Sequence, residues 1–238
     1  MKRISVSLEI THFCNKNCDL CSHRISGSDY QFLTEEQYTL IAKELQGFSI
    51  SQIDITGGEP LTHPHFNQLV VNLKKDFPSA RLVLFTNGKK LLELSKEERE
   101  RFSRIYIPWY QGFNDLEIDR VVKENNIFIK NRPLFSDPFI DPQLSAKEAM
   151  KAYKNCPMKV YRFVGTKVYG CCLAESIERT YDSGCVHVEV QPDFIHELKN
   201  VPAYRACMHC FYAPRILTDF KLRIRNRILN LRRHLLEV

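Results

Sequence analysis

Segments with strand periodicity alternate regularly with segments with helix periodicity over residues 4–130, and this alternation restricts the chain to few folds. Strands are expected at residues 4–10, 50–56, 81–85, 105–109 and 127–130. Helices are expected at residues 34–47, 65–77, 91–102 and 116–124, and Thr34 with Gln37 forms a capping box at the start of the first. Such βαβ units predict an α/β fold with a parallel sheet, in which ligands bind at the carboxyl ends of the strands.

The composition is that of a folded globular protein. Of 238 residues, 44% are hydrophobic and 26% charged, with 9 Gly and 11 Pro, which excludes disordered, fibrous and low-complexity classes. No apolar run approaches the roughly 18 residues that a membrane span needs. Met1-Lys2-Arg3 is followed by a strand pattern and not by an apolar signal core. We therefore expect no transmembrane span and a cytoplasmic location.

The net charge of +6 is concentrated near the carboxyl end. Residues 215–238 contain seven basic and two acidic side chains, so the rest of the chain is nearly neutral and nucleic-acid binding is not expected. Apolar residues in this segment have helical spacing. We expect a basic amphipathic helix at residues 215–238, which could pack on the rest of the chain, on an acidic protein partner or on an anionic membrane surface.

Three of the nine cysteines lie in the loop after the first expected strand. Cys14, Cys18 and Cys21 have C-x3-C-x2-C spacing, and we call residues 14–21 the cysteine loop. An odd number of thiols in a reducing compartment favours metal ligation over disulfides. Three thiolates at this spacing can bind one face of an iron–sulfur cube and leave its fourth iron open for catalysis. A zinc knuckle or unrelated thiols are the alternatives.

A second motif, Gly57-Gly58-Glu59-Pro60, ends the second expected strand, and we call residues 57–60 the glycine motif. Parallel strands place it at the same edge of the sheet as the cysteine loop. Glycine lets a ligand approach the backbone closely, and the Glu59 carboxylate can accept hydrogen bonds from an ammonium group. The two motifs therefore predict one binding site at this edge.

The cysteine loop and the glycine motif, in this order, resemble the CxxxCxxC and GGEP motifs of the radical S-adenosylmethionine (SAM) superfamily. The resemblance covers residues 4–132 and implies a partial (β/α)6 TIM barrel. It implies a four-iron four-sulfur cluster on Cys14, Cys18 and Cys21, whose open iron binds the amino and carboxylate groups of SAM. One electron, supplied by a flavodoxin- or ferredoxin-type donor, would cleave the C5′–S bond, and the 5′-deoxyadenosyl radical would take a hydrogen atom from substrate.

The resemblance also implies which residues contact SAM. Phe13 or Leu20 would pack near the adenine. Gly57 and Gly58 would contact the methionine amino group, and Glu59 would accept its hydrogen bond, with Pro60 next to it in the motif. Core packing is the alternative for the two apolar side chains.

Three later positions complete the implied SAM site. Asn87 lies in Thr86-Asn87-Gly88 after the third expected strand, where an ordinary Asn-Gly turn is the alternative. Gln111, after the fourth strand, is a candidate for the ribose. Arg132, after the fifth, is a candidate for the methionine carboxylate and for a catalytic role, because its planar guanidinium can pair with both carboxylate oxygens. An exposed surface arginine is the alternative for Arg132.

Most of the remaining cysteines surround an expected β-hairpin. Residues 159–164 and 167–169 flank Gly165-Thr166, which predicts the two strands and their turn. Four cysteines before and after this hairpin offer enough thiolates to bind a second cluster completely: Cys156, Cys171, Cys207 and Cys210. The arrangement resembles the twitch unit, a shortened SPASM domain that holds one auxiliary four-iron four-sulfur cluster.

Two cysteines in this region leave alternatives open. Cys172 is adjacent to Cys171 and can replace it as a ligand, and Cys185 is expected to be a buried thiol. A structural zinc site is the alternative for the terminal C-x2-C pair. The histidines, among them His12, His23, His63 and His65, show no ligand spacing and are expected to be loop or core residues.

The expected organisation has three parts: a radical SAM barrel at residues 1–145, an auxiliary cluster domain at residues 146–214, and the basic helix at residues 215–238. Size and motif order resemble the radical SAM dehydrogenases that oxidise an aminocyclitol alcohol. We therefore expect oxidation or other modification of a small polar molecule of the sugar or cyclitol type, with the auxiliary cluster accepting an electron.

Two other functions are considered. One is a radical SAM maturase that modifies a short peptide or a protein, of the thioether, epimerase or formylglycine type. The other is a non-catalytic metal-binding adaptor for nucleic acid or lipid, which gives no reason for the glycine motif at a strand end.

Overall fold

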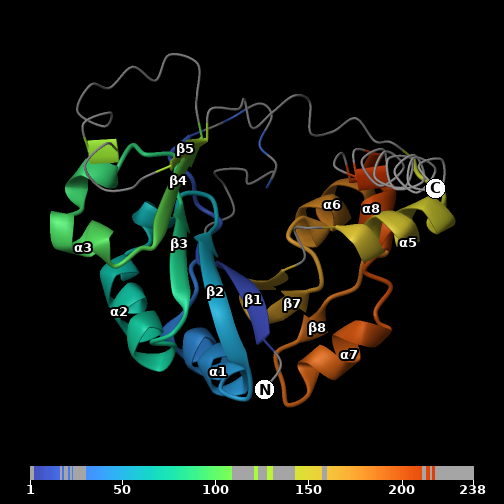
Figure 1. The fold of residues 1–238 in the computed structure, drawn as a ribbon, viewed down its shortest axis with the longest axis horizontal. Coiled ribbons are helices and arrows are strands. Elements are labelled where there is room, and N and C mark those ends of the chain that lie inside the picture. The colour runs from blue at the N-terminus through green and yellow to red at the C-terminus, as the bar shows by residue number, and fades with distance from the viewer. Residues whose placement is uncertain are drawn as a thin grey trace, which may run out of the picture.

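The structure is a computed structural model that describes residues 3–16, 18, 21, 23, 31–108, 121–122, 128–130, 143–156, 160–210, 213–214 and 216–217. The described strands form one sheet in the order β5-β4-β3-β2-β1-β6-β7-β8 (Figure 1). They are β1 (Arg3–Glu9), β2 (Ser49–Thr56), β3 (Arg81–Phe85), β4 (Arg104–Pro108), β5 (Phe128–Lys130), β6 (Tyr161–Val164), β7 (Lys167–Tyr169) and β8 (Val188–Glu189).

The strands from β1 to β5 run parallel to one another, as the alternating pattern predicts. Each lies where a strand is expected, although the pattern places both ends of β1, and the starts of β2 and β4, one residue too late. The α/β class and the partial TIM barrel are therefore confirmed. The carboxyl ends of these strands form one edge, which carries the loops that begin at Ile10, Gly57 and Thr86.

The helices in the first half of the chain are α1 (Glu35–Leu45), η1 (Pro60–Thr62), α2 (Phe66–Asp76), η2 (Leu91–Glu93) and α3 (Lys96–Glu100). Figure 1 shows α1, α2 and α3 on the outer side of β2, β3 and β4. The expected capping box of α1 is confirmed, because the Thr34 side chain accepts from the Gln37 backbone N–H and the Gln37 side chain accepts from the Thr34 N–H. The Tyr38, Ile41 and Leu45 side chains of α1 are buried.

The main core lies between these helices and the parallel strands. Alternate residues of the central strands are fully buried, as period-2 strands with a covered face require. They include Val6 and Leu8 in β1, Ile53 and Ile55 in β2, and Leu82 and Leu84 in β3. This core fixes the strands whose carboxyl ends carry the cysteine loop and the glycine motif.

The expectation of one helix at residues 91–102 is wrong. The chain forms the short η2, an extended residue at Leu94 with ψ 134°, and then α3. Ser95 causes the break, because its side chain accepts from the Glu98 N–H while the Glu98 side chain accepts from the Ser95 N–H. Such a capping box starts a new helix instead of continuing the old one. The helix expected at residues 116–124 lies outside the described residues except at 121 and 122.

The expected hairpin is confirmed, since β6 and β7 pair antiparallel around Gly165, which has φ +57°. The sequence pattern does not predict where the hairpin lies in the sheet. β6 pairs in parallel with β1, on the side of β1 away from β2, so the hairpin continues the barrel sheet.

The helices in the second half are α5 (Ala146–Asn155), α6 (Ala174–Tyr181), α7 (Phe194–Asn200) and α8 (Arg205–Met208). A second core lies between α5, β7, α6 and α8, and it contains the buried Cys185, Cys207 and Cys210. Figure 1 shows α5, α6 and α8 together on the side of the sheet away from α2 and α3. Residues 146–214 thus have a core of their own but share the sheet of the barrel, and the division at residue 145 stays a prediction.

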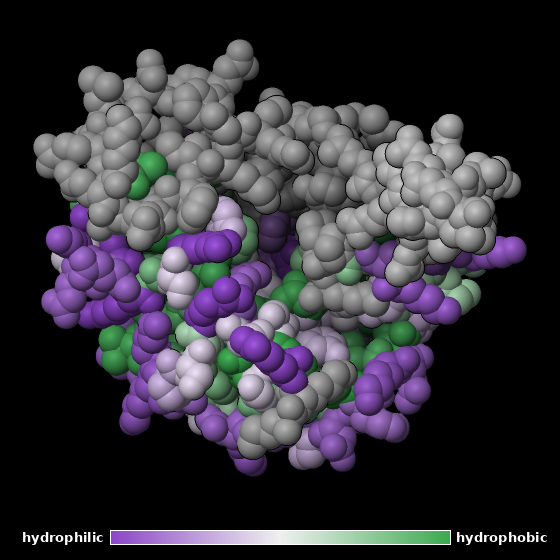
Figure 2. Space-filling view, viewed as in Figure 1, coloured by the Kyte–Doolittle hydropathy of each residue, from purple (hydrophilic) through white to green (hydrophobic). Residues whose placement is uncertain are grey.

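The face seen in Figure 2 carries hydrophilic side chains over α2 and α3, where the ribbon view places the outer helices. Among the described residues, no helix is long and apolar enough to cross a membrane. The basic segment at residues 215–238 lies outside the described residues except at 216 and 217, so its expected helix stays a prediction.

Candidate active site and second cysteine site

The cysteine loop follows β1 at the carboxyl edge of the sheet. Cys14, Cys18 and Cys21 are half-buried, and the Cys21 N–H donates to the Cys18 carbonyl at 3.2 Å. Burial raises the pKa of the Cys14 thiol, and the negative charges of Glu59, Cys21 and Cys18 raise it further, whereas a hydrogen bond from the Lys16 backbone lowers it. Cys18, Cys21 and Glu59 thus lie within electrostatic range of the Cys14 thiol.

The glycine motif packs on residues 11–14, where the chain enters the cysteine loop. The Gly58 N–H donates to the Thr11 carbonyl at 2.7 Å, and the Glu59 N–H donates to the Phe13 carbonyl at 2.8 Å. A Cβ atom at Gly58 would lie 2.1 Å from the Phe13 oxygen, and one at Gly57, where φ is +149°, would lie 2.4 Å from the Thr11 oxygen. The close neighbour that requires glycine at both positions is therefore the backbone of residues 11–13.

Glu59 joins the loops after β2 and β3. Its side chain is buried, with Oε1 accepting from the Leu61 N–H at 3.1 Å and from the Thr86 hydroxyl at 2.6 Å. Oε2 accepts from the Asn87 N–H at 2.6 Å. Burial raises the pKa of this carboxyl, and the three hydrogen bonds oppose that shift. Pro60 is also buried and begins η1.

Asn87 connects this arrangement to the cysteine loop. Its Nδ2 donates to Asn15 Oδ1 at 2.7 Å and lies 3.9 Å from Cys14 Sγ. Its Oδ1 accepts from the Lys89 N–H at 3.0 Å, and the Lys89 ammonium donates to the Asn15 carbonyl at 3.2 Å. The loops after β1, β2 and β3 thus form one hydrogen-bonded site around Cys14. Asn15 and Lys89 were not singled out by the sequence, because neither belongs to a motif that indicates metal or SAM binding.

The remaining residues of the expected SAM site divide into two sets. Phe13 is half-buried directly before the cysteine loop, and its carbonyl accepts the hydrogen bond from the Glu59 N–H. Leu20, Gln111 and Arg132 lie outside the described residues. Their roles stay predictions.

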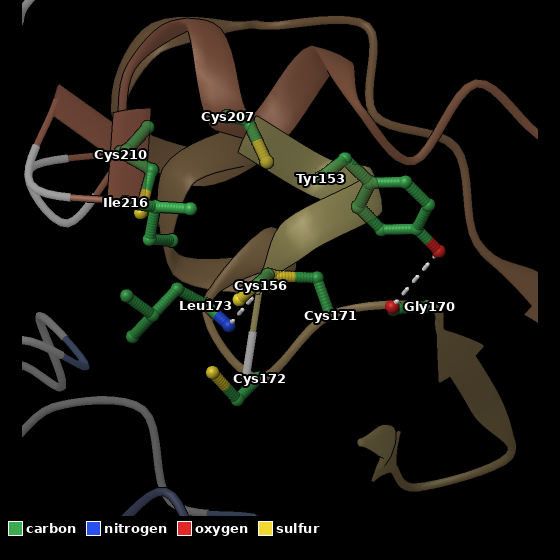
Figure 3. A pocket seen from close by; sticks show the side chains of 10 residues that line it. Tyr153, Cys156, Gly170, Cys171, Cys172, Leu173, Cys207, Cys210 and Ile216 are labelled. Atoms are coloured by element: carbon green, nitrogen blue, oxygen red, sulfur yellow. Dashed lines mark hydrogen bonds between the residues drawn. The ribbon is translucent and has the colours of Figure 1, made fainter. Parts of the chain in front are cut away.

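The second group of cysteines lines one recess (Figure 3). Five thiols take part, from Cys156, Cys171, Cys172, Cys207 and Cys210. Cys156 is the C-cap of α5, Cys171 and Cys172 follow β7, and Cys207 lies on α8. The structure thus brings together all four cysteines expected at the second site, together with the alternative Cys172.

The rest of the recess wall is mainly apolar, formed by Tyr153, Gly170, Leu173, Ala213 and Ile216. Figure 3 shows Cys207 and Cys210 on one side of the recess and Cys171 and Cys172 on the other. The donors are all thiols, and soft thiolate ligands suit an iron–sulfur cluster or zinc. Among the described side chains, no three His, Cys, Asp or Glu residues come close enough to hold a single metal ion.

Cys171 and Cys172 differ in their electrostatic environment. A hydrogen bond from the Cys172 thiol lowers the pKa of Cys171 to about 7, against the effect of burial, and the Leu173 N–H also donates to Cys171 Sγ at 3.5 Å. The same thiol–thiol hydrogen bond raises the pKa of Cys172. The hydrogen bond from the Leu173 N–H stabilises a thiolate, the form that binds metal, at Cys171.

Cys185 does not line the recess. It is buried, and burial raises the pKa of its thiol to about 12. Burial likewise raises the pKa of Cys207.

Fold and site together define a partial-barrel protein with a thiol-rich site at the carboxyl edge of its parallel strands. The family model described as the radical SAM superfamily matches residues 8–130, more than half of the chain. The chain belongs to the radical SAM superfamily, whose enzymes use a four-iron four-sulfur cluster and SAM.

Two curated relatives illustrate the sequence similarity. The sporulation killing factor maturation protein SkfB of Bacillus subtilis (strain 168) is 33% identical over 103 residues, which are 43% of this chain and 24% of SkfB. A GTP 3',8-cyclase of Staphylococcus haemolyticus (strain JCSC1435) is 28% identical over 143 residues, 56% of this chain and 39% of the cyclase. The chain thus spans well under half the length of these relatives.

Two solved structures share the fold. The crystal structure of BtrN in complex with AdoMet and 2-DOIA has a TM-score of 0.60 and 14% identity, covering 89% of this chain and 94% of BtrN. Native anSMEcpe with bound AdoMet has a TM-score of 0.55 and 12% identity, covering 96% of this chain and 99% of that one. At these identities the likeness concerns the fold alone.

Proposed function

We propose that this radical SAM protein is an oxidoreductase that removes a hydrogen atom from a small polar substrate of the sugar or cyclitol type and passes a further electron to an auxiliary cluster. The observation that carries the proposal is the recess lined by five cysteines, in a chain whose first cysteine group lies at the barrel edge. Oxidation of an alcohol removes two electrons, so a second electron acceptor is needed after the hydrogen atom has left.

The residues present fit both clusters. Cys14, Cys18 and Cys21 would hold the SAM-binding cluster and leave one iron open. Cys156, Cys171, Cys207 and Cys210 would hold the auxiliary cluster, and the hydrogen bond from the Leu173 N–H to Cys171 Sγ favours Cys171 over Cys172 as the ligand. When bound, the first cluster with SAM supplies the 5′-deoxyadenosyl radical, and the second accepts the electron.

The protein's own groups would orient SAM from the loops after β1, β2 and β3. Gly57 and Gly58 would place backbone groups near the methionine amino group, and Phe13 would lie near the adenine. Asn87 holds Asn15 and lies beside Cys14, so it positions the cysteine loop as well as offering a polar group to SAM. Gln111 and Arg132 complete the proposed site for the ribose and the methionine carboxylate, and Leu20 is the alternative near the adenine.

A small substrate is supported by the fold likeness to BtrN, which extends over 94% of that chain, crystallised with AdoMet and 2-DOIA. In size and in the order of its motifs, the chain also resembles the butirosin-pathway 2-deoxy-scyllo-inosamine dehydrogenase. We propose a flavodoxin- or ferredoxin-type protein as the electron donor to the first cluster.

A peptide-modifying maturase is the second candidate. It is favoured by the match to SkfB, which is named a maturation protein, and by the fold likeness to anSMEcpe, which has been crystallised with AdoMet and a peptide. In this case the same two cysteine sites would serve a short peptide substrate.

The experiment that tests the proposal compares substrate classes on anaerobically reconstituted protein. Deuterated aminocyclitols and polyols are offered in one series and short cysteine- or serine-containing peptides in another, and deuterium transfer into 5′-deoxyadenosine is measured by mass spectrometry. Transfer from a cyclitol carbinol position with formation of the ketone supports the proposal. Transfer from peptides alone overturns it in favour of the maturase.

A matched variant tests the role of the auxiliary site. Cys156→Ala/Cys207→Ala removes two of the proposed auxiliary ligands and leaves the cysteine loop intact. This variant should still produce 5′-deoxyadenosine but lose ketone formation at least tenfold. Ketone formation at the wild-type rate would contradict an electron-accepting role.

A further inference from the structure

Arg162 on β6 is a fully buried arginine between the two cysteine sites, with a side-chain exposure of 1%. Its Nη1 donates to the backbone carbonyl of Cys172, which lines the auxiliary recess. Its Nη2 pairs with the carboxylate of Glu9, the last residue of β1. One guanidinium thus contacts both the segment that carries Cys171 and the strand that leads into the cysteine loop.

The same guanidinium reaches the far end of the cysteine loop. Its Nη2 lies 2.9 Å from Nδ1 of His23, which follows Cys21 by two residues. Arg179 on α6 donates to the His23 carbonyl at 2.6 Å. His23 is therefore held by two arginines, one from the barrel sheet and one from α6.

Two carboxylates complete this buried network. Glu175 on α6 lies 3.8 Å from Arg162 and 2.5 Å from Arg179. Glu9, whose side chain has 0% exposure, lies 3.0 Å from His12 as well as pairing with Arg162. The positive charges of Arg162 and Arg179 balance the negative charges of Glu9 and Glu175. Of these four side chains, Arg162 is the one that donates a hydrogen bond to the Cys171-Cys172 segment.

Stability alone explains such a network poorly. Removing an arginine and a carboxylate from water costs free energy that their attraction barely offsets, and an apolar pair of similar volume often stabilises a fold as well or better. A buried charge beside a redox cluster directly changes the reduction potential of that cluster. A cluster on four thiolates is anionic and becomes more so on reduction, and hydrogen bonds and net charge nearby set its reduction potential.

We propose that Arg162 is a positioning residue for the auxiliary cluster, where its buried positive charge stabilises the reduced form and its hydrogen bond to the Cys172 carbonyl fixes the segment that carries the ligand. The inference rests on the proposed function, because it requires a cluster in the recess. The step concerned is the uptake of one electron without making or breaking a bond. The electron comes from the substrate radical in turnover and from dithionite in the test.

The test uses the full chain with Cys14→Ala/Cys18→Ala/Cys21→Ala, in which only the auxiliary cluster can form. Redox titration with dithionite, followed by electron paramagnetic resonance, gives the midpoint potential of this background protein and of the same protein with Arg162→Gln or Arg162→Lys. Iron per chain is measured in each sample. Arg162→Gln should make reduction about tenfold less favourable, a shift of about 59 mV to lower potential for one electron. Arg162→Lys keeps the charge and should stay within about threefold of the background.

Arg162→Gln leaves the buried Glu9 carboxylate without its arginine partner and could fail to fold for that reason. The double variant Glu9→Gln/Arg162→Gln replaces the ion pair by a neutral pair of similar shape. It should show a shift of the same sign as Arg162→Gln, because the arginine and not the glutamate is bonded to the Cys172 segment.

The outcomes separate this inference from the proposed function. About four irons with an unchanged potential in the double variant would overturn the inference alone. Equal shifts for Arg162→Lys and Arg162→Gln would also overturn it, because the effect would then follow from geometry and not from charge. A background protein without iron would overturn the auxiliary cluster and the inference together.

Discussion

The carboxylate of Glu59 accepts a hydrogen bond from the backbone N–H of Asn87 at 2.6 Å, and this contact joins the loop after β2 to the loop after β3. Asn87 in turn reaches Asn15 and Cys14 in the loop after β1. The buried side chains of Glu59 and Asn87 together thus connect the three loops that surround the first cysteine of the barrel site. The glutamate of the motif therefore has an architectural role in this chain, whatever contact it makes with SAM.

Glu59→Gln should destabilise the protein. The amide NH2 group of the glutamine must take the place of one carboxylate oxygen. In one orientation it faces the Leu61 N–H and in the other the Asn87 N–H, so one of these backbone donors loses its acceptor. A buried unsatisfied donor costs about 1–3 kcal/mol. Urea unfolding of the full chain measures the loss, and iron per chain after reconstitution should fall with it. Glu93→Gln, at a carboxylate whose side chain is 64% exposed, is the control and should unfold like wild type. Wild-type stability of Glu59→Gln would contradict the architectural role.

Gly58→Ala should displace the cysteine loop, because its Cβ would lie 2.1 Å from the Phe13 carbonyl oxygen. Backbone must move on one side or the other, and we expect destabilisation of about 3 kcal/mol or more. Iron in the barrel site should be lost in parallel. Gly47→Ala, where no atom lies within 4 Å of the new Cβ, is the matched control and should change stability by less than about 0.5 kcal/mol. Equal tolerance of the two substitutions would disprove the close packing.

Asp54 on β2 predicts a pH dependence of stability. Burial raises the pKa of this carboxyl to about 6, against hydrogen bonding from Gln52 and the charge of Arg81. Since the pKa in the folded state exceeds the ordinary value of 3.8, its contribution to stability is fully present below about pH 4 and is lost as the pH rises through 6. The loss is up to ~3 kcal/mol.

Asp54→Asn removes this ionisation. Relative to wild type, the variant should gain up to ~3 kcal/mol in unfolding free energy between pH 4 and pH 7. Chemical denaturation at several pH values measures the difference. Glu97→Gln, at a side chain that is 88% exposed, should leave the profile unchanged. Parallel profiles for wild type and Asp54→Asn would show that the Asp54 carboxyl is not shifted.

Substitution of Cys171 and of Cys172 should lower iron binding in the recess to different extents. The hydrogen bond from the Leu173 N–H stabilises a thiolate at Cys171, so Cys171→Ser should lower iron in the auxiliary site more than Cys172→Ser does. Cys185→Ser is the control, because Cys185 does not line the recess. Iron is counted in the Cys14→Ala/Cys18→Ala/Cys21→Ala background to exclude the first cluster. Loss with Cys172→Ser and retention with Cys171→Ser would reverse the ligand assignment.

Much of the fold could be predicted because its signals are local. The capping box of Thr34 and Gln37, the strand periodicity of β1 to β5 and the hairpin turn at Gly165 each depend on a few neighbouring residues. The error at residues 91–102 is also local, since the capping box of Ser95 and Glu98 was hidden in a charged helical pattern.

The sequence could predict that the later cysteines form a metal site, because clustered thiols in a reducing compartment have few roles other than metal binding. Five of them do line one recess. The pairing of β6 with β1 and the contact of Arg162 with Glu9 could not be predicted, because the two residues are 153 positions apart and neither belongs to a motif. For the same reason, the sequence indicates only a loop or core role for His23. Its contact with Arg162 depends on how the cysteine loop meets β6.

The measurement that tests the central claim most directly is made on anaerobically reconstituted protein. Iron and sulfide per chain and dithionite-dependent 5′-deoxyadenosine formation are determined for wild type and for Cys14→Ala/Cys18→Ala/Cys21→Ala. We predict about eight irons with SAM cleavage in the wild type, and about four irons without cleavage in the triple variant. Zinc in place of iron, or no 5′-deoxyadenosine from the wild type, would contradict a radical SAM enzyme with an auxiliary cluster.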